Sequence, residues 1–145
     1  MSDKIIQIKD GEDNAFPLSR TVQYLELDNT KMSSSTGSVQ SSSYIRIVWD
    51  DDIIIVNYYV RLQNPNGRPT ITINNFPNIA TIVGAGSPTH MRTGTTNYIT
   101  DSSSLTHQSG TTTASISMFN YIGDAPSGSG YLVLQGTVAG RVWNN

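Results

Sequence analysis

The chain has 145 residues, of which 14% are charged, and a net charge of −2. This length suits one domain, or one small domain with an appendage. The charge balance gives no electrostatic case for binding nucleic acid or an anionic membrane, since both need clustered Lys and Arg. Without cysteine, the chain forms neither disulfides nor a thiolate metal site. Because it shows no signal-peptide core and no apolar run of membrane-spanning length, we expect synthesis in a cytoplasm and no membrane insertion.

The first thirty residues predict a small β unit. Residues 4–9 alternate weakly between apolar and polar side chains, and residues 22–27 predict a second strand. Residues 10–14 have the composition of a turn. Pro17 disfavours a central strand at its position, because it lacks a backbone N–H. So small a unit is marginal alone, and we expect it to depend on another surface.

A serine-rich stretch covers residues 32–43. It can bury little surface, which predicts a flexible or extended linker, with an ordinary long surface loop as the alternative. We therefore divide the chain into an N-terminal attachment segment at residues 1–31, a linker at residues 32–43 and a β domain at residues 44–145.

Residues 44–62 are the most strand-like part of the chain. Two runs rich in β-branched and aromatic residues flank three aspartates at residues 50–52. In each run, alternate positions form one apolar face and one mixed face. Three like charges suit a solvated turn far better than a buried strand. The pattern predicts a β-hairpin with residues 50–52 at its tip.

The remaining strands are expected to be shorter. Alternation and composition predict strands at residues 70–74, 76–83, 114–122, 131–135 and 137–143. Gly136 is expected at a turn or bulge between the last two. Residues 91–100 and 102–113 contain few apolar side chains and predict long loops or exposed edge strands. Roughly eight strands separated by turn signals predict an all-β fold, an antiparallel β-sandwich or jelly-roll-like head with the small β attachment segment at its N-terminus.

The sequence offers no convincing catalytic or metal-binding motif. The two histidines, His90 and His107, match no known ligand spacing, either as a pair or with Asp101, and surface or interface histidines are favoured. The acidic residues at 10–13 and 50–52 lack the EF-hand spacing and are expected in solvated turns. The glycines at residues 84–86 lack the following Gly and helix of a phosphate-binding loop. We therefore expect no enzyme, no metal site and no cofactor.

Aromatic residues among amides and carboxylates suggest a saccharide-binding surface. Such rings cover the apolar C–H faces of a sugar, while amides and carboxylates bond to its hydroxyl groups. The candidate ligand-binding residues are Tyr58, Tyr59, Tyr98, Asp101 and Tyr121, with clefts formed by the loops expected at residues 84–113. The alternative is that most of the aromatic residues lie in the core or in an oligomer interface.

Three stretches resemble proteins of tailed-phage particles. Residues 6–19 (IQIKDGEDNAFPLS) resemble the opening segment of many tail, fibre and head-fibre proteins, with a strand, an Asp-Gly-Asn turn and an aromatic-Pro-apolar step. Residues 45–56 (IRIVWDDDIIIV) resemble the first hairpin of phage receptor-binding head domains. The turn there usually carries Gly or Asn, whereas this chain has only Asp. Residues 130–136 (GYLVLQG) resemble the last strands of such heads.

The resemblance implies a non-enzymatic structural protein of the virion, a head or tail fibre or decoration component, assembled in the bacterial host cytoplasm. It implies a β head that forms a homotrimer and, in tail versions, binds host-surface saccharide. The implied docking residues, which would contact other virion proteins, are Ile6, Ile8, Phe16, Pro17 and Leu18. A decoration protein that binds only virion proteins is one alternative. A carbohydrate-binding module or receptor-binding protein that recognises host cell-wall saccharide is another.

Overall fold

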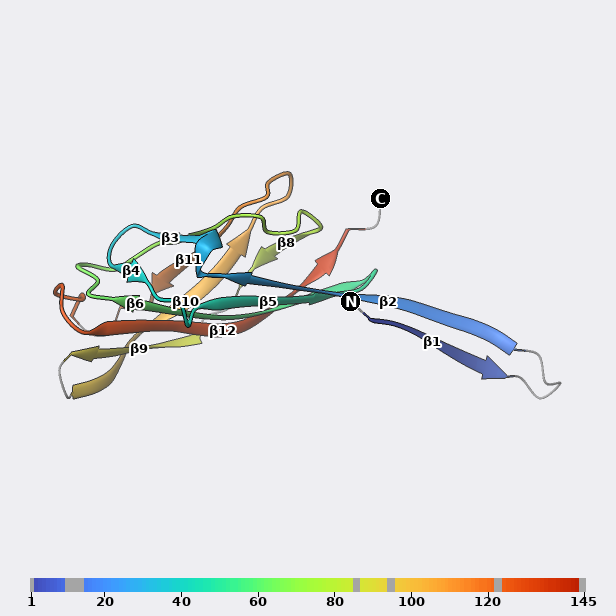
Figure 1. The fold of residues 1–145 in the computed structure, drawn as a ribbon, viewed down its shortest axis with the longest axis horizontal. Coiled ribbons are helices and arrows are strands. Elements are labelled where there is room, and N and C mark those ends of the chain that lie inside the picture. The colour runs from blue at the N-terminus through green and yellow to red at the C-terminus, as the bar shows by residue number, and fades with distance from the viewer. Residues whose placement is uncertain (1, 10–14, 85–86, 94–95, 122–123, 144–145) are drawn as a thin grey trace.

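The computed structural model describes residues 2–9, 15–84, 87–93, 96–121 and 124–143, with side chains for residues 22–84, 101–121 and 124–143. These residues form an antiparallel β structure that curls into a nearly closed, sandwich-like body (Figure 1). The all-β prediction is therefore confirmed. The elements are β1 (Ser2–Lys9), β2 (Ala15–Asp28), the 3-10 turn η1 (Asn29–Lys31), β3 (Met32–Ser34), β4 (Ser38–Val39), β5 (Tyr44–Trp49), β6 (Ile53–Gln63), β7 (Ile71–Ile73), β8 (Ala80–Val83), β9 (Ser87–Thr93), β10 (Thr96–His107), β11 (Ala114–Phe119) and β12 (Tyr131–Val142).

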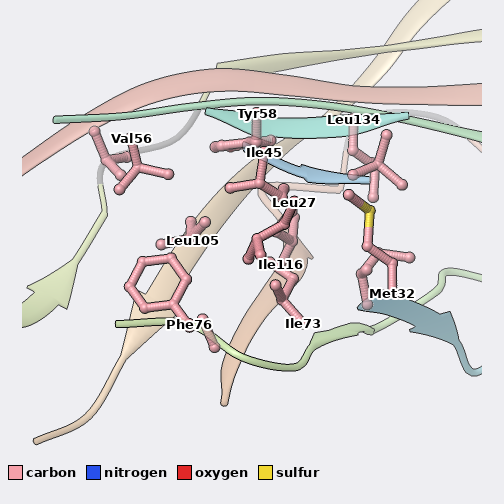
Figure 2. Packing of buried hydrophobic residues seen from close by; sticks show 14 of the residues in the cluster. Leu27, Met32, Ile45, Val56, Tyr58, Ile73, Phe76, Leu105, Ile116 and Leu134 are labelled. Carbon is pink, nitrogen blue, oxygen red and sulfur yellow. The ribbon is translucent and has the colours of Figure 1, made fainter. Parts of the chain in front are cut away.

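The strands enclose one hydrophobic core between two layers. One layer contains β2, β5, β6 and β12, and the other contains β10, β11, β7 and β3. Both β8 and β9 pair with β12 and with β10, which joins the layers along one side. Figure 2 shows side chains from the two layers meeting in this core, among them Tyr58 and Ile45 from one layer and Ile73 and Ile116 from the other.

The predicted central hairpin is confirmed. β5 pairs with β6 from Tyr44 opposite Tyr59 to Trp49 opposite Ile54. The apolar face of each strand is buried, as its alternation predicted. Asp50 organises the tip, because its Oδ1 accepts the backbone N–H groups of Asp52 at 2.8 Å and Ile53 at 2.9 Å. Burying each large aliphatic side chain of such a face stabilises the fold by about 1.5–3 kcal/mol relative to leaving it exposed.

The N-terminal hairpin projects from the body as an arm. Residues 23–28 of β2 pair with β5, whereas residues 15–22 pair with β1. We call residues 2–9 and 15–22 the arm, and the described residues from 23 onward the body. Figure 1 shows the arm extending beyond the body. Among the described strands Pro17 has only β1 as a neighbour, which fits the expectation that it avoids a central strand. The turn predicted at residues 10–14 lies outside the described residues.

The serine-rich residues 32–43 differ from the expected linker. β3 pairs with β7, and β4 pairs with β6. Met32 is buried in the core, and the Ser43 hydroxyl accepts the Arg61 backbone N–H at 3.0 Å. Backbone hydrogen bonding does not require apolar side chains, so a serine-rich segment can add short strands to a sheet whose core is formed by other residues.

The prediction of long loops or exposed edge strands at residues 91–100 and 102–113 is only partly correct. Residues 108–113 form no strand, and among the described strands residues 96–99 pair with β9 alone, as an edge does. In contrast, β9 lies between β10 and β12, and residues 102–107 of β10 pair with β8 and β9 on one side and with β11 on the other. Backbone pairing on both sides keeps this half of β10 in the sheet despite its few apolar side chains. Residues 131–143 do not form two strands separated at Gly136, because β12 runs unbroken beside β6 across that glycine.

Candidate ligand-binding groove

The outer face of β5, β6 and β12 carries a groove of about 480 Å³. Two neighbouring rows of the sheet supply its side chains. In one row Tyr44 lies opposite Tyr59, which lies opposite Gln135. In the next row Asn57 lies opposite Thr137. Cross-strand neighbours on one face of a sheet lie close enough to interact, so the sheet itself brings these residues together. Gly136 and Tyr58, whose side chain is buried in the core, complete the lining.

Two stacked tyrosines form the aromatic wall of the groove. The ring centroids of Tyr44 and Tyr59 are 5.7 Å apart, with 18° between the ring planes. The Arg46 guanidinium carbon lies 4.2 Å from the centroid of Tyr44. The stack restrains both rings, so an aromatic surface is present before a ligand arrives.

Polar groups complete the groove on the side of β12. The Asn57 side-chain amide donates to the Thr137 hydroxyl at 3.0 Å. Asn57, Thr137 and Gln135 are all exposed. An amide has two donors and two acceptor sites, so the row offers bonding groups of both kinds to a ligand with several hydroxyl groups.

An ion pair borders the groove without giving it a strong charge. Glu26 accepts hydrogen bonds from Arg46 Nε at 2.9 Å and from the Tyr24 hydroxyl at 2.8 Å. These two bonds hold the pKa of the Glu26 carboxyl below its ordinary value, and the bond from Arg46 contributes most to this shift. Glu26 is therefore anionic at neutral pH and balances Arg46. The groove thus suits a neutral polar ligand.

The structure separates the predicted ligand-binding residues. Tyr59 lines the groove. Tyr58 is only 1% exposed, its hydroxyl lies 3.0 Å from Ser103 Oγ, and burial raises its pKa. Its ring therefore belongs to the core, because alternation along β6 turns it away from the outer face. Tyr98 pairs with Met91 through the backbone, and its side chain lies outside those described.

Asp101 and Tyr121 gather around Arg68, away from the groove. The buried Asp101 carboxylate pairs with the Arg68 guanidinium, next to an irregularity in β10. The same guanidinium carbon lies 4.1 Å from the centroid of the exposed Tyr121 ring. The pair links the chain before β7 to β10, which is a structural role, and Asp101 is not exposed to a ligand.

Sequence reasoning missed Tyr44, Asn57, Gln135 and Thr137 as site residues. Alternation does place Tyr44 and Asn57 on the mixed faces of their strands, which was a usable signal. Gln135 and Thr137 gave no comparable signal, because nothing local to them shows that β12 lies beside β6.

The described side chains offer no metal site, and His107 is structural. No cluster of three or more His, Cys, Asp or Glu residues that could hold a metal occurs among them. His107 is buried, with its ring nitrogens 2.6 Å from the Ala80 carbonyl oxygen and 3.0 Å from that of Thr111. The side chain of His90 lies outside those described. The described part of the chain also contains no helix with the length and apolar character needed to span a lipid bilayer.

The predicted docking residues all lie in the arm. The register pairs Ile6 with Leu18 and Ile8 with Phe16, and alternation puts these four positions on one face of the arm. Pro17 occupies the opposite face. No protein-family model and no curated protein matches the chain.

Proposed function

We propose that the chain is a non-enzymatic structural protein of a phage virion, which docks on other virion proteins through its arm and displays the body for attachment to the host surface. The resemblance of residues 6–19, 45–56 and 130–136 to such proteins motivates this function. The projecting arm supports it, because a two-stranded hairpin is marginally stable without further packing and gains stability from a partner surface.

A host-surface saccharide is the ligand that the groove fits best. The single observation that carries this proposal is the stacked pair Tyr44 and Tyr59 beside the exposed amides and hydroxyl of β12. Aromatic rings cover the C–H faces of sugars, and amides bond to the hydroxyl groups. The groove volume of about 480 Å³ lies within the range of about 300–1,000 Å³ that is usual for small-molecule sites.

An array of bacterial surface polysaccharides tests the ligand class. The full chain should bind at least one glycan, and Tyr59→Ala should weaken that binding at least tenfold, or about 1.4 kcal/mol. Tyr121→Ala is the matched control, since it removes an exposed tyrosine outside the groove and should bind as the wild type does. Silence of the array at high protein concentration, or equal losses in the two variants, would contradict the proposed site.

Particle association separates the remaining alternatives. A decoration protein would bind phage particles while the array stays silent. A carbohydrate-binding module or free receptor-binding protein would bind cell-wall saccharide without associating with particles. The proposed attachment protein does both, and its particle association should not depend on Tyr59.

A further inference from the structure

One face of β2 runs without interruption from the arm onto the body. Alternation places the even-numbered residues from Phe16 to Asp28 on this face, and the strand pairs with β1 and then with β5 without a change of phase. The right-handed twist of the strand turns the face gradually along its length. We call this face of β2, with its partner positions on β1 and the row of the sheet that continues from Tyr24, the β2 strip. Its members are Ser2, Lys4, Ile6, Ile8, Phe16, Leu18, Arg20, Val22, Tyr24, Glu26, Asp28, Val48, Ile55 and Ala139.

The body end of the strip exposes an apolar row. Tyr24, Val48 and Ile55 follow one another across three strands, and Ile53 lies next to them on β6. These four side chains are between 38% and 49% exposed. Contiguous exposed apolar side chains on a soluble body mark an interaction surface more often than scattered ones do.

The arm end of the same strip also carries apolar residues. Ile6, Ile8, Phe16 and Leu18 share its face by register. The arm is a two-stranded hairpin, so little of its own chain can cover that face. Both ends of the strip therefore gain by burial against an apolar partner.

The charges on the strip make it complementary to itself. At the arm end, Lys4 lies opposite Arg20. At the body end, β2 carries Glu26 and Asp28, and both carboxylates are exposed. Arg46 neutralises part of this acidic end through its ion pair with Glu26. An arm laid on the body of another copy thus places basic positions near acidic ones, which favours this partner over an unrelated apolar surface.

We propose that the arm of one copy lies on the β2 strip of a second copy, with its apolar face against the row of Tyr24, Val48 and Ile55 and with Lys4 and Arg20 towards Glu26 and Asp28. This goes beyond the proposed function, which requires only that the arm docks on the particle. The contact is head-to-tail, so it closes into a ring when the rotation between copies allows it. This contact uses four of the five residues that the resemblance assigns to virion docking, Ile6, Ile8, Phe16 and Leu18, and leaves the opposite face of the arm, with Pro17, for the virion.

Cross-linking tests the contact directly, because the chain has no cysteine of its own. A mixture of the Leu18→Cys and Ile55→Cys proteins should form a mixed disulfide on mild oxidation. A mixture of Leu18→Cys with Val83→Cys is the control, since Val83 is 82% exposed and lies outside the strip. Equal cross-linking in the two mixtures would overturn the proposal.

The solution mass of the full chain gives a second, independent test. The wild type should be oligomeric, and Ile55→Glu should raise the dissociation constant at least tenfold, whereas Val83→Glu should leave it unchanged. Circular dichroism would confirm that each variant is folded. We expect a dissociation constant of ~10 µM, so most of the protein should be associated at 100 µM. A wild type that is still monomeric at 100 µM would overturn the proposal.

The failure of this contact can be told apart from the failure of the proposed function. Leu18→Glu changes the arm, far along the chain from the groove, and should abolish self-association while glycan binding through Tyr59 persists. An intact oligomer with a silent array would contradict the saccharide site alone. A monomer that still binds glycan would contradict the contact alone.

Discussion

Tyr58 shows how single polar atoms are accommodated between the two layers. Its ring is enclosed by the core, and its hydroxyl bonds to Ser103 of β10, which is itself buried. The bond connects β6 in one layer with β10 in the other. A buried hydroxyl without a partner costs about 1–3 kcal/mol, so this one contact helps to fix how the layers face each other.

Burial of Tyr58 predicts a specific loss of stability in alkali. Burial raises the pKa of Tyr58, while its hydrogen bond with Ser103 lowers it by a smaller amount. The unfolded chain loses this proton at about pH 10, so the contribution is complete below that pH and is lost as pH rises through the higher folded pKa. Between pH 8 and 10.5, the free energy of unfolding should fall more in the wild type than in Tyr58→Phe. Urea titrations at both pH values measure this, and equal falls would contradict it.

The tip of the central hairpin depends on one carboxylate. Asp50 accepts hydrogen bonds from two backbone N–H groups of the turn, whereas the neighbouring Asp51 is exposed. Asp50→Ala should therefore lower the free energy of unfolding by about 1 kcal/mol, a typical net value for lost hydrogen bonds. Asp51→Ala is the matched control and should stay within about 0.5 kcal/mol of the wild type. Chemical denaturation of both variants checks the difference, and equal losses would show that the two bonds contribute nothing specific.

The same elements show how far the sequence predicts this fold. The hairpin of β5 and β6 was predictable because alternation marks its buried face directly. β10 was not, because its inward positions include Asp101, Ser103 and His107, which read as polar. Their burial is tolerated because Arg68, Tyr58 and the Ala80 carbonyl group, all distant in sequence, satisfy them.

The candidate groove was likewise only partly predictable from the sequence. Tyr59 was predictable as an aromatic residue on a mixed face. Its neighbours Gln135 and Thr137 were not, because they lie about eighty positions away and meet β6 only through the register of β12. Local patterns predict which face a residue occupies, whereas the partner across the sheet depends on topology.

The body and the arm differ in the contacts that stabilise them. β6 is paired with β5 and β12 on its two sides and contributes five fully or nearly fully buried side chains to the core. Even the serine-rich β3 is tied to β7. The arm consists of two strands that pair with each other. Its stability therefore depends far more on association than that of the body does.

This difference predicts two levels of protection in amide hydrogen exchange. In the monomeric Leu18→Glu protein, amides of β6 and β12 should exchange only through global unfolding, while those of β1 exchange faster through opening of the arm alone. Amides of β3 should follow the body, since β3 belongs to its sheet. In the associated wild type, β1 should become more protected as protein concentration rises, because a bound neighbour must leave before the arm opens. Equal protection of β1 and β6 in the monomer would show that the arm is stable by itself, which would remove the physical reason for its docking.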